Sequence, residues 1–309
     1  MASLDLDALA ARLPDRPLTR FAPSPTGYLH LGHVASAIHV WGIARALGGR
    51  VLLRLEDHDG GRCRPEYEAA LLEDLEWLGL EPDAGAIGEL RAGTSPIRQS
   101  DCGGTYDEAL RRLIGAGDGG GQVFGCDCSR RDIAAEGGDQ FNEETPYPGR
   151  CRERGLGIAT GRGVRLRIEA GTERFTDALL GERVQRPAAQ CGDLLVRDRR
   201  GQWTYQFAVV VDDLRHGVDL VIRGEDLLSS TGRQLRLGRL LGGARPPVFL
   251  HHPLITKPNG AKLSKASGDS GIRELRRAGV SPAAVLGRAA WLTALLDKPR
   301  ELGVGELAG

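Results

Sequence analysis

The sequence predicts an α/β protein built on a parallel sheet. Strand-like and helix-like segments alternate near the N-terminus, and the alternation returns near residue 203. Such alternation is typical of parallel sheets with right-handed crossovers, in which ligands bind beyond the carboxyl ends of the strands. The expected strands are 18–22, 51–55, 220–223 and 248–250, and the expected helices are 31–47, 65–78 and 229–241.

Local signals place the ends of these elements. Apolar residues recur at helical spacing after His30, so the first long helix is expected to begin near that residue. Pro65 favours a helix start, and Gly79 ends that helix. A last helix, 283–296, follows Ser281 as its cap and Pro282 at its first position. Residues 1–15 are expected to form a short helix or a disordered lead-in.

The middle of the chain interrupts this pattern. The alternation breaks over 84–104, a short helix is expected over 106–114, and the segments 115–121 and 155–163 are expected to be loops. Strand-like segments at 164–168 and 193–196 indicate an inserted subdomain, after which 203–211 resumes the alternation. We expect a discontinuous nucleotide-binding catalytic domain in 1–103 and 197–275, an inserted subdomain in 104–196, and a C-terminal helical segment in 276–309.

Composition excludes several classes of protein. Lys plus Arg and Asp plus Glu both number 41, so no global charge attracts nucleic acid or membrane. No apolar run is long enough to span a bilayer, and the acidic start is unlike a secretory signal. Six cysteines in 309 residues are unlike a disulfide framework. We expect a cytoplasmic protein with no membrane partner.

The stretch RFAPSPTGYLHLGH, residues 20–33, joins the first strand to the first helix. A helix N-terminus offers free backbone N–H groups and a partial positive charge to an anion. His30 and His33 lie three residues apart, on one face of the first helical turn, and both can donate to phosphate. This turn predicts a phosphate site, and the loop with Lys262 and Lys265 is expected to close over it.

Charged residues at other strand ends predict a site for an acidic amino acid. Glu56 closes the second strand and can hold an ammonium group. Arg20 and Arg223 can grip a carboxylate by forked hydrogen bonds, and Tyr205 can position the same ligand. Arg233, Arg236 and Arg239 form a helix face that is either a phosphate-backbone contact or solvated, and the trio Arg150, Arg152 and Arg154 is a second candidate patch. His39, His58, His216, His251 and His252 receive no role.

A group of cysteines predicts a metal site. Cys126 and Cys128 form C-x-C, and Cys151 follows after about twenty residues. Three thiolates and one further ligand suit a tetrahedral structural Zn²⁺ site, with Tyr147, Asp127 or a water as the fourth ligand. Three reduced buried cysteines without a metal are the alternative.

Several motifs together resemble the glutamyl branch of the class I aminoacyl-tRNA synthetases, over residues 18–296. HLGH at 30–33 resembles the "HIGH" signature, and KLSK at 262–265 resembles the "KMSKS" loop. The stretches RLED at 54–57, YQFAVVVDD at 205–213, VIRGEDLL at 221–228 and HHPLI at 251–255 also resemble this branch. The residues after Lys265 are too few for an anticodon-binding domain. This short C-terminal part and the pattern C-x-C…Y-x-x-x-C are together similar to the glutamyl-Q tRNA(Asp) synthetase family.

The resemblance implies a Rossmann-like parallel sheet with an inserted zinc-bearing acceptor-type subdomain. It implies that His30, His33 and Lys265 bind ATP, and that these three residues and Lys262 are catalytic. It also implies one structural Zn²⁺ held by Cys126, Cys128, Tyr147 and Cys151. The residues that it implies for glutamate are Arg20, Phe21, Ala22, Pro23, Ser24, Glu56, Tyr205 and Arg223. The sequence departs from the family over 57–61, where His58 stands, near Cys102, and over 115–121.

The activity implied by the resemblance is that of a ligase. Without tRNA, L-glutamate and ATP, with Mg²⁺, give glutamyl-adenylate, and the glutamyl group then passes to queuosine in the anticodon loop of tRNA(Asp). A monomer is expected. One alternative is a minimal glutamyl-tRNA synthetase that charges a tRNA 3′ end. Another is a catalytically inactive paralogue that binds RNA.

Overall fold

A four-stranded parallel sheet lies at the centre of the computed structural model, which describes residues 4–115, 122–136, 145–255 and 271–308. Its strands are β1 (Leu18–Phe21), β2 (Arg50–Leu53), β8 (Leu220–Gly224) and β9 (Val248–His252), in the order β2-β1-β8-β9. The register places Arg20 beside Leu52, and Arg223 beside His251. The predicted parallel α/β class is therefore confirmed, and the carboxyl ends of all four strands lie at one edge.

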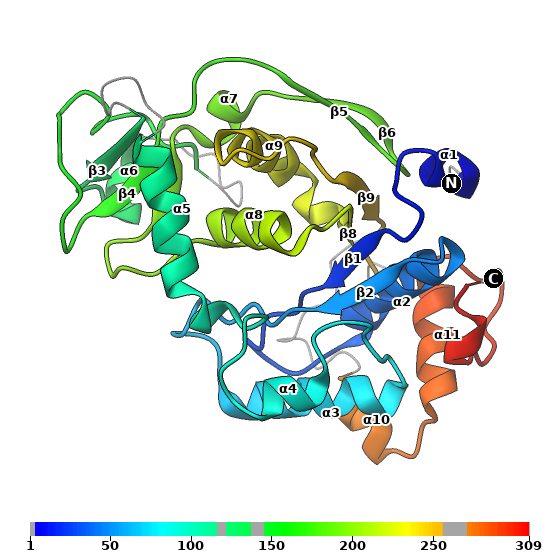
Figure 1. The fold of residues 1–309 in the computed structure, drawn as a ribbon. Coiled ribbons are helices and arrows are strands. Elements are labelled where there is room, and N and C mark those ends of the chain that lie inside the picture. The colour runs from blue at the N-terminus through cyan, green and yellow to red at the C-terminus, as the bar shows by residue number, and fades with distance from the viewer. Residues whose placement is uncertain (1–3, 116–121, 137–144, 256–270, 309) are drawn as a thin grey trace.

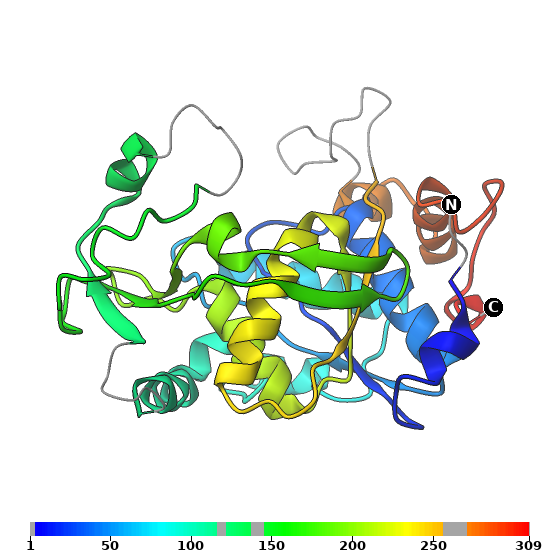
Figure 2. The same cartoon turned by 90° about the horizontal axis from the view of Figure 1, so that it is seen from above.

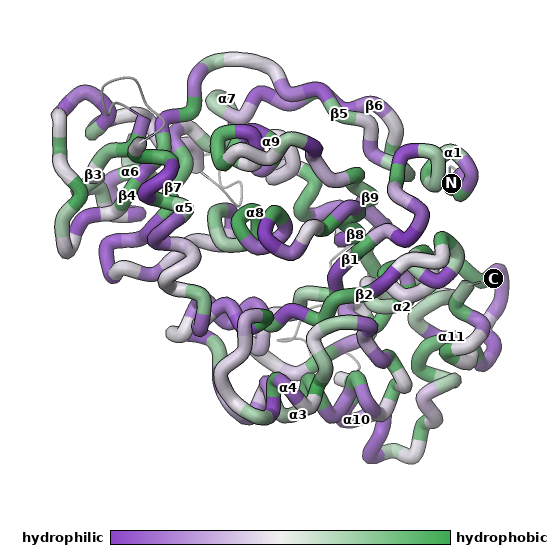
Figure 3. Tube along the Cα trace, viewed as in Figure 1, coloured by the Kyte–Doolittle hydropathy of each residue, from purple (hydrophilic) through white to green (hydrophobic). Residues whose placement is uncertain are grey.

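Four of the described helices pack around this sheet (Figure 1). Three were predicted: α2 (Leu31–Ala46), α3 (Pro65–Leu78) and α9 (Thr231–Leu240). The fourth, α8 (Tyr205–His216), forms where residues 203–211 were expected only to resume the alternation. The helix α2 is buried on most sides, because α11 (Pro282–Leu292) covers it opposite the sheet. In contrast, α8 alternates between hydrophobic and hydrophilic residues (Figure 3), and its Phe207–Val211 stretch is buried. The last helix ends at Leu292 rather than at the expected residue 296.

A second, antiparallel sheet forms within the interruption. Its order is β3 (Val123–Cys126), β4 (Gly163–Leu166) and β7 (Leu194–Arg197), and α6 (Arg130–Glu136) follows β3. The helix α5 (Gly103–Gly115) leads into it and begins three residues before its expected start. A separate core joins α5, this sheet and α8 through Tyr106, Leu110, Val164 and Phe207. The expected strands 164–168 and 193–196 are thus confirmed with shifted ends.

A hairpin between β5 (Glu173–Asp177) and β6 (Gly181–Gln185) has no counterpart among the predicted elements. Figure 2 shows this hairpin lying across α9. It changes the interpretation of the α9 arginines, since Glu173 accepts from Arg236 Nε at 2.8 Å and from Arg239 Nη2 at 2.6 Å, while Arg233 is buried. The expectation that these three side chains form one RNA-facing or solvated face is therefore wrong for Arg233 and Arg236, whereas the Arg239 side chain is 53% exposed.

Short helices complete the described chain. The lead-in forms α1 (Leu6–Ala10), α4 (Ile87–Arg91) lies where the alternation breaks, α7 (Pro187–Cys191) follows the hairpin, and α10 (Ile272–Arg277) precedes α11. Turns of 3-10 helix cover Gln99–Asp101, Glu225–Ser230 and Val304–Glu306, so the expected helix from residue 229 is α-helical only from Thr231. None of the described helices is long and apolar enough to cross a membrane.

Candidate active site and metal site

A cavity of about 540 Å³ opens at the carboxyl ends of β1 and β8, beside the N-terminus of α2. The described residues predicted for glutamate and for the ATP phosphates meet in it, although they are spread over two hundred positions of the sequence. Those that line it are Arg20, Phe21, Ala22, Pro23, Ser24, His30, His33, Glu56, Tyr205 and Arg223. The cavity also contacts His58 and His252, which sequence reasoning left without a role.

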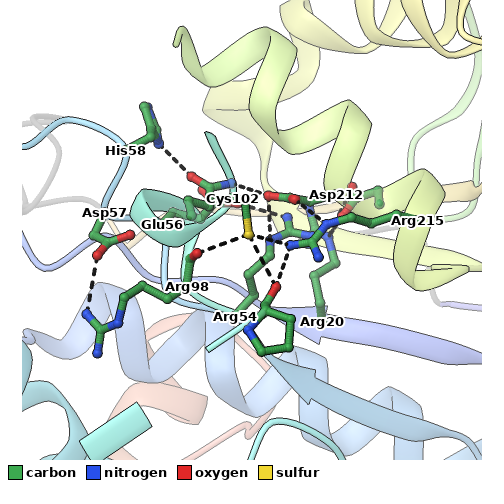
Figure 4. Close-up of polar contacts among 12 residues, drawn as sticks. Arg20, Arg54, Glu56, Asp57, His58, Arg98, Cys102, Asp212 and Arg215 are labelled. Carbon is green, nitrogen blue, oxygen red and sulfur yellow. Dashed lines mark hydrogen bonds and ion pairs between the residues drawn. The ribbon is translucent and has the colours of Figure 1, made fainter. Parts of the chain in front are cut away.

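One wall of the cavity is held by a buried ion cluster around Arg54 (Figure 4). The Arg54 guanidinium is fully buried; Nη2 donates to Glu56 Oε1 at 2.9 Å, and Nη1 donates to Asp213 Oδ1 at 2.6 Å. Arg20 Nε lies 3.3 Å from the same Asp213 oxygen. Burial alone would raise the pKa of Asp213, but the charges of Arg20 and Arg54 hold it below its usual value. Glu56 and Arg20 are therefore held in fixed positions where they reach the cavity.

A second charged group in the cavity lining is Arg223, which is buried and surrounded by neutral hydrogen-bond acceptors. Its Nη1 donates to Gln234 Oε1 at 2.7 Å, its Nη2 to Thr231 Oγ1 at 2.9 Å, and its Nε to His251 Nε2 at 3.0 Å. Within the described ranges, no carboxylate lies within 4.0 Å of this guanidinium as an ion partner. Burial lowers the pKa of Arg223. A buried cation without an acidic partner favours a ligand that carries a carboxylate.

The His30–His33 turn differs in one respect from its prediction. His30 caps α2, and its Nδ1 accepts from Gly32 N at 3.1 Å, while His33 Nδ1 accepts from His30 N at 3.1 Å. His33 N donates to the His30 carbonyl at 2.9 Å. The prediction of free backbone N–H groups is therefore wrong for Gly32 and His33. Because both Nδ1 atoms accept, each neutral ring carries its proton on Nε2, which makes that atom the donor toward an anion.

The loop with Lys262 and Lys265 lies outside the described residues. Its flanks on both sides belong to the candidate site. Ile255 lines the cavity, and Gly271 pairs with His30 in an antiparallel bridge, where Ile272 N donates to the Leu29 carbonyl at 3.0 Å.

The predicted metal ligands also meet, at the end of β3. The sulfur atoms of Cys126, Cys128 and Cys151 lie within 4.8 Å of one another, and all three cysteines are free thiols. The Tyr147 hydroxyl lies 3.5 Å from Cys126 Sγ and accepts from Cys151 N at 2.8 Å. Three thiols and a phenol at one point fit a tetrahedral thiophilic ion. Asp127 instead binds Arg162 Nε at 2.9 Å, which favours Tyr147 over Asp127 as the fourth group.

Two arginines balance charge at this cluster. Arg165 is buried, stacks on the Tyr147 ring with its guanidinium carbon 3.7 Å from the ring centre, and donates from Nε to Cys126 Sγ at 3.4 Å. Arg154 Nη1 donates to Cys151 Sγ at 3.4 Å. Such donors stabilise thiolates, the form in which cysteine binds a metal.

Sequence reasoning missed the residues that bind and orient the charged side chains of the cavity wall. Asp213 anchors Arg20 and Arg54, and His251 accepts from Arg223. His251 Nδ1 in turn bonds Asp177 Oδ2 at 2.6 Å, and both side chains are fully buried. Burial lowers the pKa of His251, although the Asp177 hydrogen bond opposes that shift. The adjacent acids at 212–213 inside an apolar run were the one signal available in the sequence.

Comparison with known proteins agrees with this geometry. Residues 18–296 match the family described as tRNA synthetases class I (E and Q), catalytic domain. The chain therefore belongs to that family of class I synthetases, and it is a ligase-type enzyme.

Within the family, the chain is similar to proteins named glutamyl-Q tRNA(Asp) synthetase. It is 41% identical to that of Symbiobacterium thermophilum, with 93% of this chain and 90% of the relative covered. It is 40% identical to that of Nitratidesulfovibrio vulgaris, with 90% and 86% covered. A crystal structure of a glutamate tRNA ligase from Elizabethkingia meningosepticum, in complex with its amino acid, superposes with a TM-score of 0.75 at 26% identity. That superposition covers 95% of this chain and 64% of the ligase chain.

Proposed function

We propose that the protein activates L-glutamate with ATP and transfers the glutamyl group to queuosine in the anticodon loop of tRNA(Asp). The observation that carries the first half is Arg223, a buried guanidinium whose hydrogen-bond partners among the described residues are neutral and which lines the same cavity as Glu56. A γ-carboxylate would bind Arg223 and Arg20, and the α-ammonium group would bind Glu56. Glutamine would leave the guanidinium charge uncompensated, so the site favours the acid over the amide.

The phosphate end of the cavity supports the first chemical step. The glutamate α-carboxylate attacks the α-phosphate of ATP, and pyrophosphate leaves. His30 and His33 would donate from Nε2 to phosphate oxygens, and Lys262 and Lys265 would neutralise charge as it develops. ATP brings Mg²⁺, which supplies the remaining positive charge. Position and charge neutralisation account for most of the catalysis in such a step.

The acceptor is inferred from the relatives rather than from the cavity. Two relatives that match at least 90% of this chain are named for tRNA(Asp), and the chain spans 90% and 86% of their lengths. We propose that residues 104–196 form the inserted RNA-facing subdomain between the two halves of the catalytic domain, 1–103 and 197–275, with 276–309 as a helical C-terminal segment. One zinc ion held by Cys126, Cys128, Tyr147 and Cys151 would stabilise that subdomain. The protein would act as a monomer on cytoplasmic tRNA.

Labelled glutamate tests the acceptor. The protein is incubated with ATP and tRNA(Asp), either with queuosine or with guanosine at the same position. Transfer to the queuosine-containing tRNA alone supports the proposal. Equal labelling of both tRNAs would support the minimal synthetase that charges a 3′ end. Labelling of neither tRNA, without ATP consumption, would support the inactive paralogue.

A further inference from the structure

His58 lines the cavity at a point between its buried end and its rim. Glu56 is 6% exposed and Asp57 is 8% exposed, His58 is half-buried, and Gly60 to Arg62 are exposed. The His58 ring centre lies 6.5 Å from that of Tyr205, which reaches the cavity from the start of α8. A side chain at this position shares the cavity with Glu56 and lies nearer to solvent than Glu56 does.

The protonation of this imidazole is fixed by a chain of hydrogen bonds (Figure 4). Gln99 Nε2 donates to Asp212 Oδ2 at 2.7 Å, which orients the Gln99 carbonyl oxygen toward His58. His58 Nδ1 lies 2.6 Å from that oxygen, so Nδ1 carries the proton and donates it. The neutral ring therefore has an unprotonated Nε2, which can accept a proton. Gln99 and Asp212 act through His58 and are positioning residues.

The Asp212 carboxylate is fixed by several donors, so the hydrogen bonds from Asp212 through Gln99 to His58 have one arrangement. It is fully buried, accepts from the Tyr106 hydroxyl at 2.9 Å and from Arg215 Nε at 2.8 Å, and lies 3.8 Å from Arg54 Nε. A carboxylate held by these donors keeps the Gln99 amide group facing it. The same cluster thus fixes the glutamate-site wall through Arg54 and the His58 tautomer through Gln99.

We propose that His58 is a general base for the second step, and this inference rests on the proposed function. The acceptor hydroxyl oxygen bonds to the glutamyl carbonyl carbon of the adenylate. Its proton passes to His58 Nε2, and the carbon–oxygen bond to the phosphate breaks, so that AMP leaves with the electron pair. The imidazolium then releases its proton to water. The first step transfers no proton from a hydroxyl and makes no use of His58.

The test separates the two steps in His58→Gln, which keeps a polar side chain but removes the base. Glutamate-dependent pyrophosphate exchange without RNA is expected to stay within about twofold of wild type. Single-turnover transfer from preformed adenylate to queuosine-containing tRNA is expected to fall about 100-fold, a typical contribution of a general base. The wild-type transfer rate should decrease as the pH is lowered and imidazole takes up a proton, and this dependence should vanish in the variant. His216→Gln, which replaces a histidine outside the cavity, is the matched control.

A nitrogen-15 spectrum of the ring gives a readout that is independent of activity. The His58 signal, assigned by its loss in His58→Gln, is expected to show a protonated Nδ1 and a bare Nε2. In Gln99→Leu it should shift toward the opposite tautomer, with a larger loss of transfer than of exchange. A wild-type His58 protonated on Nε2, or equal losses of exchange and transfer in His58→Gln, would overturn this role alone. Failure of the wild-type protein to label the tRNA would contradict the proposed function as well.

Discussion

His251 Nε2 accepts a hydrogen bond from Arg223 Nε at 3.0 Å, and the fixed tautomer of His251 makes that contact possible. The other ring nitrogen, Nδ1, donates to Asp177 Oδ2 at 2.6 Å, so Nε2 is left as an acceptor. Asp177 belongs to the β5–β6 hairpin, whereas Arg223 belongs to the central sheet. The orientation of the guanidinium in the glutamate site therefore depends on an element outside the sheet.

Replacement of Arg223 tests the role of this guanidinium. Arg223→Ala is expected to raise the glutamate KM at least about thirtyfold, equivalent to about 2 kcal/mol, because a charge-assisted pair is lost. The KM for ATP should change much less. Steady-state pyrophosphate exchange with each substrate varied measures both values. Arg223→Lys keeps the charge but loses the two parallel N–H donors, so its glutamate KM should lie between those of wild type and Arg223→Ala. Equal increases of the KM for glutamate and for ATP would contradict the assignment.

Asp177→Asn tests the hydrogen bonds that orient Arg223 through His251. The asparagine amide can donate to His251 Nδ1, which turns the imidazole to the other tautomer and places a proton on Nε2 facing Arg223 Nε. Two donors would then oppose each other, and the glutamate KM is expected to rise about tenfold, or about 1.4 kcal/mol. Arg174→Gln, on the same strand, is the control. An unchanged glutamate KM in Asp177→Asn would show that the hairpin has no part in orienting Arg223.

Asp74 predicts a specific pH dependence of stability. It is 3% exposed on α3, its Oδ2 has no hydrogen-bond partner in the part of the chain that the structure describes, and burial raises its pKa to about 6 from the usual value of 3.8. The folded state thus binds a proton more tightly than the unfolded state does. Stability is greatest below the unfolded value and falls as the pH rises through this window, by at most about 3 kcal/mol.

Asp74→Asn removes the charge and should make the protein more stable than wild type at pH 7 to 8. The difference should shrink as the pH is lowered toward 4, when wild-type Asp74 becomes protonated. Urea unfolding at several pH values measures it. Glu73→Gln, at the exposed neighbouring position, is the control, and its difference in stability from wild type should not follow this pH dependence. A stability difference for Asp74→Asn that stays constant with pH would show that Asp74 protonation is not responsible.

The metal prediction has its own readout. The purified protein is expected to contain one zinc per chain, and Cys126→Ser should lose it and unfold at a lower temperature. Pyrophosphate exchange should persist, because the cysteine cluster lies on the β3–β4–β7 sheet and not on the parallel sheet. Elemental analysis and thermal unfolding follow the two effects. Cys191→Ser, outside the cluster, should keep its zinc; a zinc-free wild type would contradict the site.

Parallel-sheet geometry explains why much of the site was predictable from the sequence. Strand ends meet at one edge, so the sequence alone predicts that Arg20, Glu56 and Arg223 lie together, as they do in the cavity. The supporting acids could not, because Asp213 lies inside a helix and Asp177 in an unpredicted hairpin. Side-chain capping of α2 was equally hidden, since a pattern does not show which way an imidazole turns.

The hairpin itself escaped prediction for a physical reason. Its strands, with polar residues such as Arg174 and Arg183, do not bury one continuous apolar face, and they are stabilised by contacts with α9 and β9. Tertiary contacts of this kind leave little trace in local periodicity. The same contacts bury Glu173 against Arg236 and Arg239, so the α9 arginines do not form one continuous exposed face.

Glutamate-dependent exchange of pyrophosphate into ATP, measured with no RNA present, tests the central claim most directly. We predict exchange with L-glutamate that is at least 100-fold faster than with L-glutamine, about 2.7 kcal/mol of discrimination, because the amide cannot neutralise Arg223. Exchange that requires tRNA, or that proceeds equally with glutamine, would contradict the account of the site.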